Sequence, residues 1–198
     1  KEQAAHALIE KSGGKFYASR GLDLDVRFED EGLSSEALQA LASIHGIEAL
    51  SLGQRQTTTL TTDDLEAIAK ISSRETLNFR TFFEMADADL SVLTKLPNLT
   101  RLEFPRAMSL NDGHLAQLSG LSTLTSFRCF GTNGGLTDTG ISALAVNRSL
   151  ETLDLQETDA SGTFLADLSE MPLSELSITK RYGADPTLTD ANARRLEK

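Results

Sequence analysis

The chain has little of what most metal-binding, membrane and nucleic-acid-binding proteins need. Its 198 residues include a single cysteine, Cys129, which excludes an internal disulfide and any zinc or iron–sulfur site built from several cysteines. No stretch approaches the roughly 18 consecutive apolar residues of a membrane-spanning helix, so we expect no membrane insertion. The net charge is -10 and the chain lacks a run of lysines or arginines, which argues against nucleic acid as a partner.

The sequence starts at Lys1 without a methionine, and no apolar segment typical of a secretory leader follows. Because no run is long enough to span a membrane, we expect a soluble protein. One interpretation is that a targeting segment has already been removed and that the protein is exported, which leaves the compartment open.

A short motif recurs about every 25 residues. Its copies open at Leu33, Leu60, Met85, Leu110, Leu136, Ala160 and Leu188. In most copies, apolar residues follow the opening residue at offsets 5, 8, 11, 14, 17 and 19. In the copy at Leu110 these are Leu115, Leu118, Leu121, Leu124, Phe127 and Cys129. The first spacings place one apolar stripe along a short helix, and the last two place two side chains on one face of a strand. Such a period is typical of a solenoid.

Acidic residues gather where each motif would start its helix, after a Ser, Thr or Asn suited to an N-cap. They are Glu36, Asp63, Asp64, Asp87, Asp89, Asp112, Asp138 and Asp190. We interpret them as helix-capping acids that complement the helix dipole and account for most of the negative charge. The alternative is an acidic face for a basic partner.

The repeats divide one domain into three parts. Residues 1–32 form an N-terminal cap, with a helix over 2–11 that ends at Gly13-Gly14 and a strand over 22–28. Residues 33–185 contain the repeats, each a helix and a strand, and the shared crossover predicts one parallel sheet. Residues 186–198 carry either a C-terminal cap helix or a partial repeat of a longer array.

The ends of several copies match the pattern L-x-x-L-x-L, as in Ile47–Leu52, Leu99–Phe104 and Leu150–Leu155. With the Leu-Thr-Asp motif, the chain resembles the ribonuclease-inhibitor-like, helix-bearing class of leucine-rich repeats. The resemblance implies an α/β fold, a right-handed solenoid shaped as a horseshoe or arc, with the sheet on the concave face and the helices on the convex face. It also implies recognition of proteins through the concave face and no cofactor. The asparagine usual after the L-x-L pair is absent, which predicts looser loops. Its place holds Arg55, Phe82, Ala107, Thr132, Thr158 and Arg181.

If offsets 17 and 19 face the core, offsets 16, 18 and 20 must face outward on the sheet. Arginines and exposed aromatic residues are enriched in interface hot spots. The protein-binding candidates are Arg80, Arg101, Glu103, Arg128, Phe130 and Asp154 on the sheet, with Phe82 and Phe83 on the adjacent loop. The alternative is that the arginines pair with acids of neighbouring strands and the phenylalanines pack the loops.

Other candidates point to structural roles. His6, His45 and His114 lie on separate segments, so we expect solvated helix residues rather than metal ligands. Cys129 occupies a core position and is expected to be inert. The glycine-rich loop over residues 131–135 lacks the Lys-Ser/Thr of a phosphate-binding loop.

The sequence therefore predicts a non-catalytic module that recognises a protein partner. Nothing in it supports catalysis, a cofactor or a metal. We expect a monomer, with self-association through the C-terminal edge as an alternative. The other functional alternatives are a structural spacer within a larger protein and the substrate-recognition part of an enzyme whose catalytic domain lies elsewhere.

Overall fold

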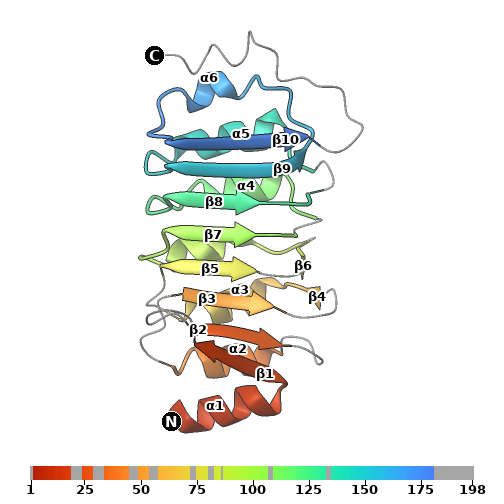
Figure 1. Ribbon diagram of the computed structural model, residues 1–198, viewed down its shortest axis with the longest axis vertical. Helices are drawn as coiled ribbons and strands as arrows, with labels where there is room; N and C mark the ends of the chain where they lie inside the picture. The colour runs from red at the N-terminus through yellow and green to blue at the C-terminus, as the bar shows by residue number, and fades with distance from the viewer. Residues whose placement is uncertain are drawn as a thin grey trace.

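The strands stack in chain order along the long axis of the molecule (Figure 1). The computed structural model describes residues 2–18, 24–28, 34–44, 49–53, 58–71, 75–79, 83–85, 87–106, 109–132 and 135–180. The eight-stranded sheet consists of β1 (Gly14–Ala18), β2 (Leu24–Phe28), β3 (Ala49–Gly53), β5 (Thr76–Phe79), β7 (Arg101–Phe104), β8 (Ser126–Cys129), β9 (Thr152–Thr158) and β10 (Glu175–Lys180). A separate parallel pair joins β4 (Thr58–Thr59) to β6 (Phe83–Glu84).

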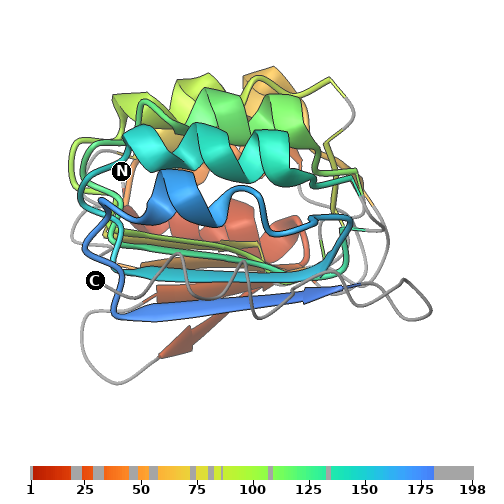
Figure 2. The same ribbon diagram turned by 90° about the horizontal axis from the view of Figure 1, so that it is seen from above.

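The helices cover one face of this sheet and leave the other face open (Figure 2). They are α1 (Glu2–Lys11), α2 (Ser35–Leu41), α3 (Thr62–Ala69), the 3-10 helix η1 (Leu90–Lys95), α4 (Asp112–Leu118), α5 (Asp138–Ala143), the 3-10 helix η2 (Leu144–Val146) and α6 (Leu165–Leu168). The predicted alternation of helix and strand is confirmed. In the Met85 copy, however, the helix is of the 3-10 type, and in the Ala160 copy it spans only four residues.

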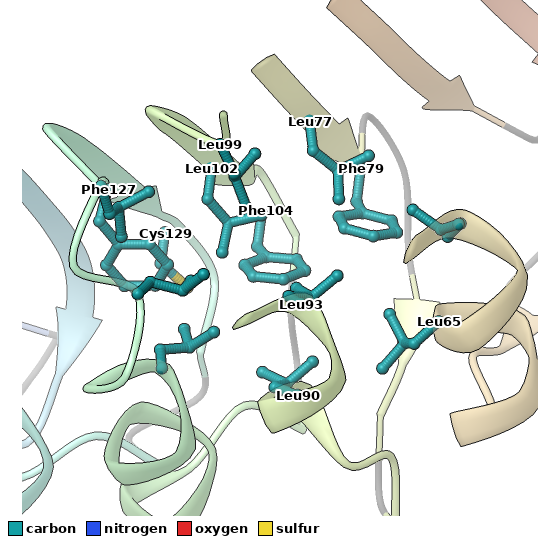
Figure 3. Close-up of a cluster of buried hydrophobic side chains, with 14 of the residues drawn as sticks. Leu65, Leu77, Phe79, Leu90, Leu93, Leu99, Leu102, Phe104, Phe127 and Cys129 are labelled. Atoms are coloured by element: carbon teal, nitrogen blue, oxygen red, sulfur yellow. The ribbon is translucent and has the colours of Figure 1, made fainter. Parts of the chain in front are cut away.

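The core lies between the two layers, and its strand residues repeat in register. Leu77 pairs with Leu102, Leu102 with Phe127, and Phe127 with Leu153, and all four side chains are fully buried. The ring of Phe104 stacks on Phe79 at 4.8 Å between centroids and meets Phe127 edge-on at 6.3 Å. Leucines of the helical layer close the cluster from below (Figure 3). The inward orientation predicted for offsets 17 and 19 is therefore confirmed for these repeats.

The N-terminal edge of the sheet differs from the prediction. The shared crossover predicted one parallel sheet, with a first strand over residues 22–28. Instead, β1 follows α1 at once and pairs antiparallel with β2, with Phe16 opposite Val26. Only five residues separate β1 from β2, which suffices for a hairpin but not for the crossover that a parallel pair requires. The remaining strand pairs of this sheet are parallel.

Four helices begin at the predicted N-cap. The side chains of Ser34, Thr61, Asn111 and Thr137 each accept a hydrogen bond from a backbone N–H in the first turn of the following helix. Because these residues sit at one position of the motif, helix starts recur with the repeat.

Two of the acids do not cap their own helices and thus correct the sequence interpretation. The carboxylate of Asp112 accepts hydrogen bonds from Thr137 N at 2.8 Å and Thr137 Oγ1 at 2.6 Å, one repeat later. Asp138 likewise accepts from the backbone N–H groups of Ser161 and Gly162, both at 2.9 Å. Gly140 at the start of α5 lets Asp112 of the preceding repeat come this close, since a Cβ at Gly140 would lie 2.7 Å from the Cα of Asp112. These acids join successive repeats at the start of the helical layer.

His114 makes another connection between repeats and is not the solvated residue that the sequence predicts. Its side chain is 4% exposed. The backbone N–H of Asn111 donates to His114 Nδ1 at 3.2 Å, so Nδ1 carries no proton. The proton of the neutral ring is therefore on Nε2, which donates to Met85 O at 3.1 Å. Burial lowers the pKa of His114, against smaller opposing effects of the Met85 carbonyl and Asp87. The ring of His6 packs against Phe16 in a tilted arrangement with 4.3 Å between centroids, and His45 lies outside the described residues.

Replacing Asp138 with asparagine should destabilise the junction between two repeats. Asp138→Asn turns one acceptor oxygen into a donor that faces the N–H groups of Ser161 and Gly162. We expect the free energy of unfolding in urea to fall by about 2 kcal/mol near neutral pH. Asp63→Asn is the control, because the exposed Asp63 makes no hydrogen bond within the described residues, and its effect should stay within about 0.5 kcal/mol. Equal losses in both variants would contradict the assignment.

The advantage of wild type over Asp138→Asn should also disappear in acid. Burial raises the pKa of Asp138, but the hydrogen bonds from Ser161, Gly162 and Phe164 outweigh it and leave the pKa below its usual value of 3.8. The unfolded chain therefore takes up this proton first. The contribution is complete above the unfolded pKa of about 3.9 and is lost as the pH falls through the lower folded pKa. Urea unfolding between about pH 5 and about pH 2 should show the two proteins converging.

Mild acid should weaken the fold through His114. Because its folded pKa lies below the unfolded value of about 6.5, this contribution is complete above about pH 6.5 and is lost as the pH falls. We expect wild type to lose more stability than His114→Leu between about pH 7.5 and about pH 5.5, by at most about 1.4 kcal/mol per pH unit. Identical pH slopes in urea unfolding would show that His114 does not titrate in this way.

Candidate functional site

The open face of the sheet presents two rows of polar side chains that alternate with the buried ones. In the first row, Thr76 of β5 pairs with Arg101 of β7, Arg101 with Ser126 of β8, and Ser126 with Thr152 of β9. In the second, Asn78 pairs with Glu103, Glu103 with Arg128, and Arg128 with Asp154. Since neighbouring strands lie about 4.8 Å apart, these side chains form one continuous surface. The outward orientation predicted for these positions is confirmed by their partial or full exposure.

Arg101 is the exposed cation in the middle of this face. Its Nε donates a hydrogen bond to Thr76 Oγ1 at 3.0 Å on the neighbouring strand. Within the described residues, it forms no ion pair with a carboxylate. The Thr76 contact holds the stem of the side chain and leaves the terminal nitrogens of the guanidinium group for an external acceptor.

Arg128 is held more firmly than Arg101. Its Nη2 lies 3.4 Å from Glu175 Oε2 on β10, across β9, while Glu103 and Asp154 flank it in register. Asn78 Nδ2 donates to Glu103 Oε2. Two buried polar atoms, Arg128 Nε and Asn78 Oδ1, have no hydrogen-bond partner in the described part of the chain. The alternative that the arginines pair with acids of neighbouring strands thus holds for Arg128 only in part, since its partner Glu175 lies two strands away, and Arg101 has no such pair within the described residues.

The structure brings part of the predicted site together. Arg101, Glu103, Arg128 and Asp154 lie on three consecutive strands, and we call them, with Glu175, the charged cluster. Half-buried Phe130 follows β8 and donates its backbone N–H to Phe104 O at 3.0 Å. Arg80 and Phe82 lie outside the described residues, as does the side chain of Phe83, whose backbone is in β6.

Glu175 was not among the site residues predicted from the sequence, although it binds Arg128. The copy opening at Ala160 is one residue shorter than the others, so its strand is offset within the motif. The register places Glu175 beside Thr152, in the same row as Arg101. Aligning the shortened copy on its strand already places Glu175 on this face from the sequence, but the ion pair with Arg128 is visible only in the structure.

Three hollows lie away from the charged cluster: one at the N-terminal hairpin around Phe16, one beside His114 in the helical layer, and one at the C-terminal end around Met171. Within the described residues, no three His, Cys, Asp or Glu side chains are grouped to hold a metal ion. Burial raises the pKa of the Cys129 thiol well above its ordinary value, so this cysteine stays protonated.

None of the helices in the described part of the chain is long and apolar enough to cross a membrane.

No model of a protein family matches the chain, and no curated protein matches its sequence. Among solved structures, it is similar to the Arabidopsis receptor kinase HAESA in complex with the peptide hormone IDA and the co-receptor SERK1. The TM-score is 0.52 and the sequence identity is 16%. The match covers 82% of this chain and 27% of the HAESA chain, so this chain spans about a quarter of the length of that protein. At this identity the likeness shows the fold alone. Together with the in-register repeats, it shows that the chain has a leucine-rich-repeat-like fold.

Proposed function

We propose that this protein is a non-catalytic module that binds a protein partner through the open face of its sheet. The observation that carries the proposal is the state of Arg101, whose guanidinium group is exposed and has no ion-pair partner among the described residues. Arginine in this state can bind a carboxylate or main-chain carbonyls of a partner with a pair of hydrogen bonds. The other charges of the cluster would orient the bound partner on this face.

Rigidity of the surface supports this function. β7 and β8 each pair with a strand on both sides, and Leu102 and Phe127 anchor them in the core with no exposed area. Ordering a loop or a mobile side chain on binding costs free energy, and a sheet held from both sides avoids most of that cost for its backbone. Partner side chains would thus meet a surface already in its binding geometry.

The charges of the surface also indicate the kind of partner. The charged cluster has two arginines against three carboxylates, so this face is close to neutral although the chain has a net charge of -10. Its signs alternate along the rows, which favours a partner with mixed charges over a strongly basic one. The HAESA structure, with its peptide hormone and co-receptor, is a precedent for a peptide or protein ligand on a fold of this kind.

We also propose that the chain belongs to the ribonuclease-inhibitor-like class and coils right-handed with the sheet on its concave face. Residues 1–32 would then be the N-terminal cap of the repeats 33–185. The antiparallel β1 supports the capping role, because it covers the outer edge of β2. Monomeric behaviour is likewise proposed.

Reversing the charge of Arg101 and Arg128 together should strongly weaken the proposed binding. Peptides are first selected from a random phage-displayed library on the immobilised wild-type protein, and their affinities are measured by calorimetry. For Arg101→Glu/Arg128→Glu we expect a loss of affinity of at least about tenfold per disrupted contact. The matched control Lys70→Glu/Lys95→Glu makes the same change in net charge on the helical layer, and its affinities should stay within about twofold.

Circular dichroism and thermal melting would verify that both variants fold. A failure to select any binder would contradict the proposal. So would equal affinities for the two double variants, because the binding surface would then lie elsewhere.

A further inference from the structure

A glutamate near the end of β9 has an unusual backbone conformation. Glu157 has a φ of 62°, and in the described part of the chain it is the only residue other than glycine with a positive φ. A side chain makes this left-handed conformation costly, because the Cβ crowds the following carbonyl oxygen. Residues held in such conformations gather at functional sites, where the strain is kept for a purpose.

The preceding repeat has the same conformation with the residue that suits it. Gly131 lies at offset 21 of its copy, as Glu157 does, and its φ is 71°. A buried threonine follows in both repeats, Thr132 and Thr158. Thr132 Oγ1 donates a hydrogen bond to Glu157 O at 3.0 Å, which helps to hold the strained peptide in place. Glycine would satisfy this backbone without strain, so the reason for a glutamate lies in its side chain.

A β-bulge turns that side chain away from the core. Leu155 pairs with Ile178 and Thr158 with Lys180, so β9 has one residue more than β10 between these two pairs. In regular alternation, Glu157 would point inward as Leu155 does. Instead Glu157 is exposed, and Thr158 takes the buried position. Bulges redirect side chains in this way and are frequent beside functional sites.

The carboxylate of Glu157 lies over Gly131, where the chain contributes no side chain. Oε2 is 3.9 Å from the position that a Cβ of Gly131 would occupy, and the Cα of Arg106 is 3.8 Å from the same position. Within the described residues, the Glu157 side chain takes part in no ion pair and no hydrogen bond. Half-buried Phe130 comes directly before Gly131 and offers apolar surface beside the carboxylate.

We propose that Glu157 binds a lysine or arginine side chain of the protein partner at the edge of the open face. This inference rests on the proposed function and specifies the chemistry of the partner. The carboxylate accepts charge-assisted hydrogen bonds from the basic group, and Phe130 packs against its aliphatic stem. The strained backbone holds the carboxylate outward before the partner arrives, which lowers the cost of ordering it on binding.

The distance between Glu157 and Arg101 sets the spacing of the groups on the partner. Arg101, Ser126 and Thr152 lie in one row across three strands, and Glu157 follows Thr152 by five positions. Two strand spacings of about 4.8 Å and five residues of about 3.3 Å separate the two side chains by roughly 19 Å. An extended peptide covers this distance in about six residues. The partner segment therefore carries an acidic residue for Arg101 and a basic residue for Glu157, about six positions apart.

Removing the carboxylate should weaken binding without destabilising the fold. Peptides selected on the wild-type protein from a random phage-displayed library are titrated by calorimetry against Glu157→Gly and Glu157→Gln. We expect both variants to lose about fivefold or more in affinity. Glu157→Gln keeps the Cβ, so its loss cannot come from a change of the backbone. Glu157→Gly should also raise the melting temperature by about 2 °C, because glycine relieves the strain.

Glu151→Gln is the matched control, because it removes one negative charge from an exposed glutamate just before the start of β9. Its affinities should stay within about twofold of wild type. Unchanged affinity in both Glu157 variants would overturn the inference, while the proposed function would stand if Arg101→Glu/Arg128→Glu still weakened the same peptides. An arginine reversal without effect, or a selection without binders, would instead overturn the proposed function and this inference with it.

Reversing the charge at position 157 should change the sequences that are selected. With immobilised Glu157→Lys, we expect peptides that carry an acidic residue where the wild-type binders carry lysine or arginine. The acidic residue that meets Arg101, about six positions away, should be kept. A purely structural role of Glu157 would leave the selected sequences as they were. The same charge at this position in both selections would therefore overturn the inference.

Discussion

Equivalent residues of neighbouring repeats lie side by side in the sheet, and the rest of the structure depends on this register. Leu77, Leu102, Phe127 and Leu153 follow one another across four strands because each parallel pair is formed without a shift. A slip of one residue on any strand would turn its leucines to solvent and its polar residues into the core. The same register places Arg101, Glu103, Arg128 and Asp154 together on the opposite face. The proposed binding surface is thus a product of the packing beneath it.

Two kinds of polar contact hold successive repeats in that register. Within the sheet these are the backbone ladders. In the loops, side chains reach from one repeat to the backbone of another, as Asp112 does to Thr137, Asp138 to Ser161, and buried Asn147 to the carbonyl of Leu121 at 2.6 Å. The asparagines that usually follow the L-x-L pair in leucine-rich repeats are absent from the sequence, and acids at the helix starts connect successive repeats instead. Asp112 and Asp138 thus hold these two junctions without asparagine, while the expectation of looser loops stays a prediction.

The repeat motif was enough to predict the layered α/β architecture, the inward leucines and the N-caps, because period and side-chain type together determine which face each residue occupies. It failed where a contact depends on the distance between repeats. The carboxylates of Asp112 and Asp138 look like ordinary helix-capping acids in the sequence, and only the approach of the next repeat reveals their true acceptor role. His114 looked solvated for the same reason, since its partner, Met85, lies 29 residues away. The site's rows followed from the alternation of strand residues, but the Arg128–Glu175 pair spans two strands, which no local pattern encodes.

The antiparallel hairpin gives the sheet two ends of different kinds. At the β10 end, the next strand position continues the parallel order, so another unit of the same sequence period would find the hydrogen-bonding pattern that β10 itself found on β9. At the β1 end the chain direction is reversed, and such a unit would meet a ladder of the opposite polarity. Elongation of the array by duplicated units is therefore directional: the fold can lengthen past β10 without new interactions, whereas lengthening past β1 requires a different design.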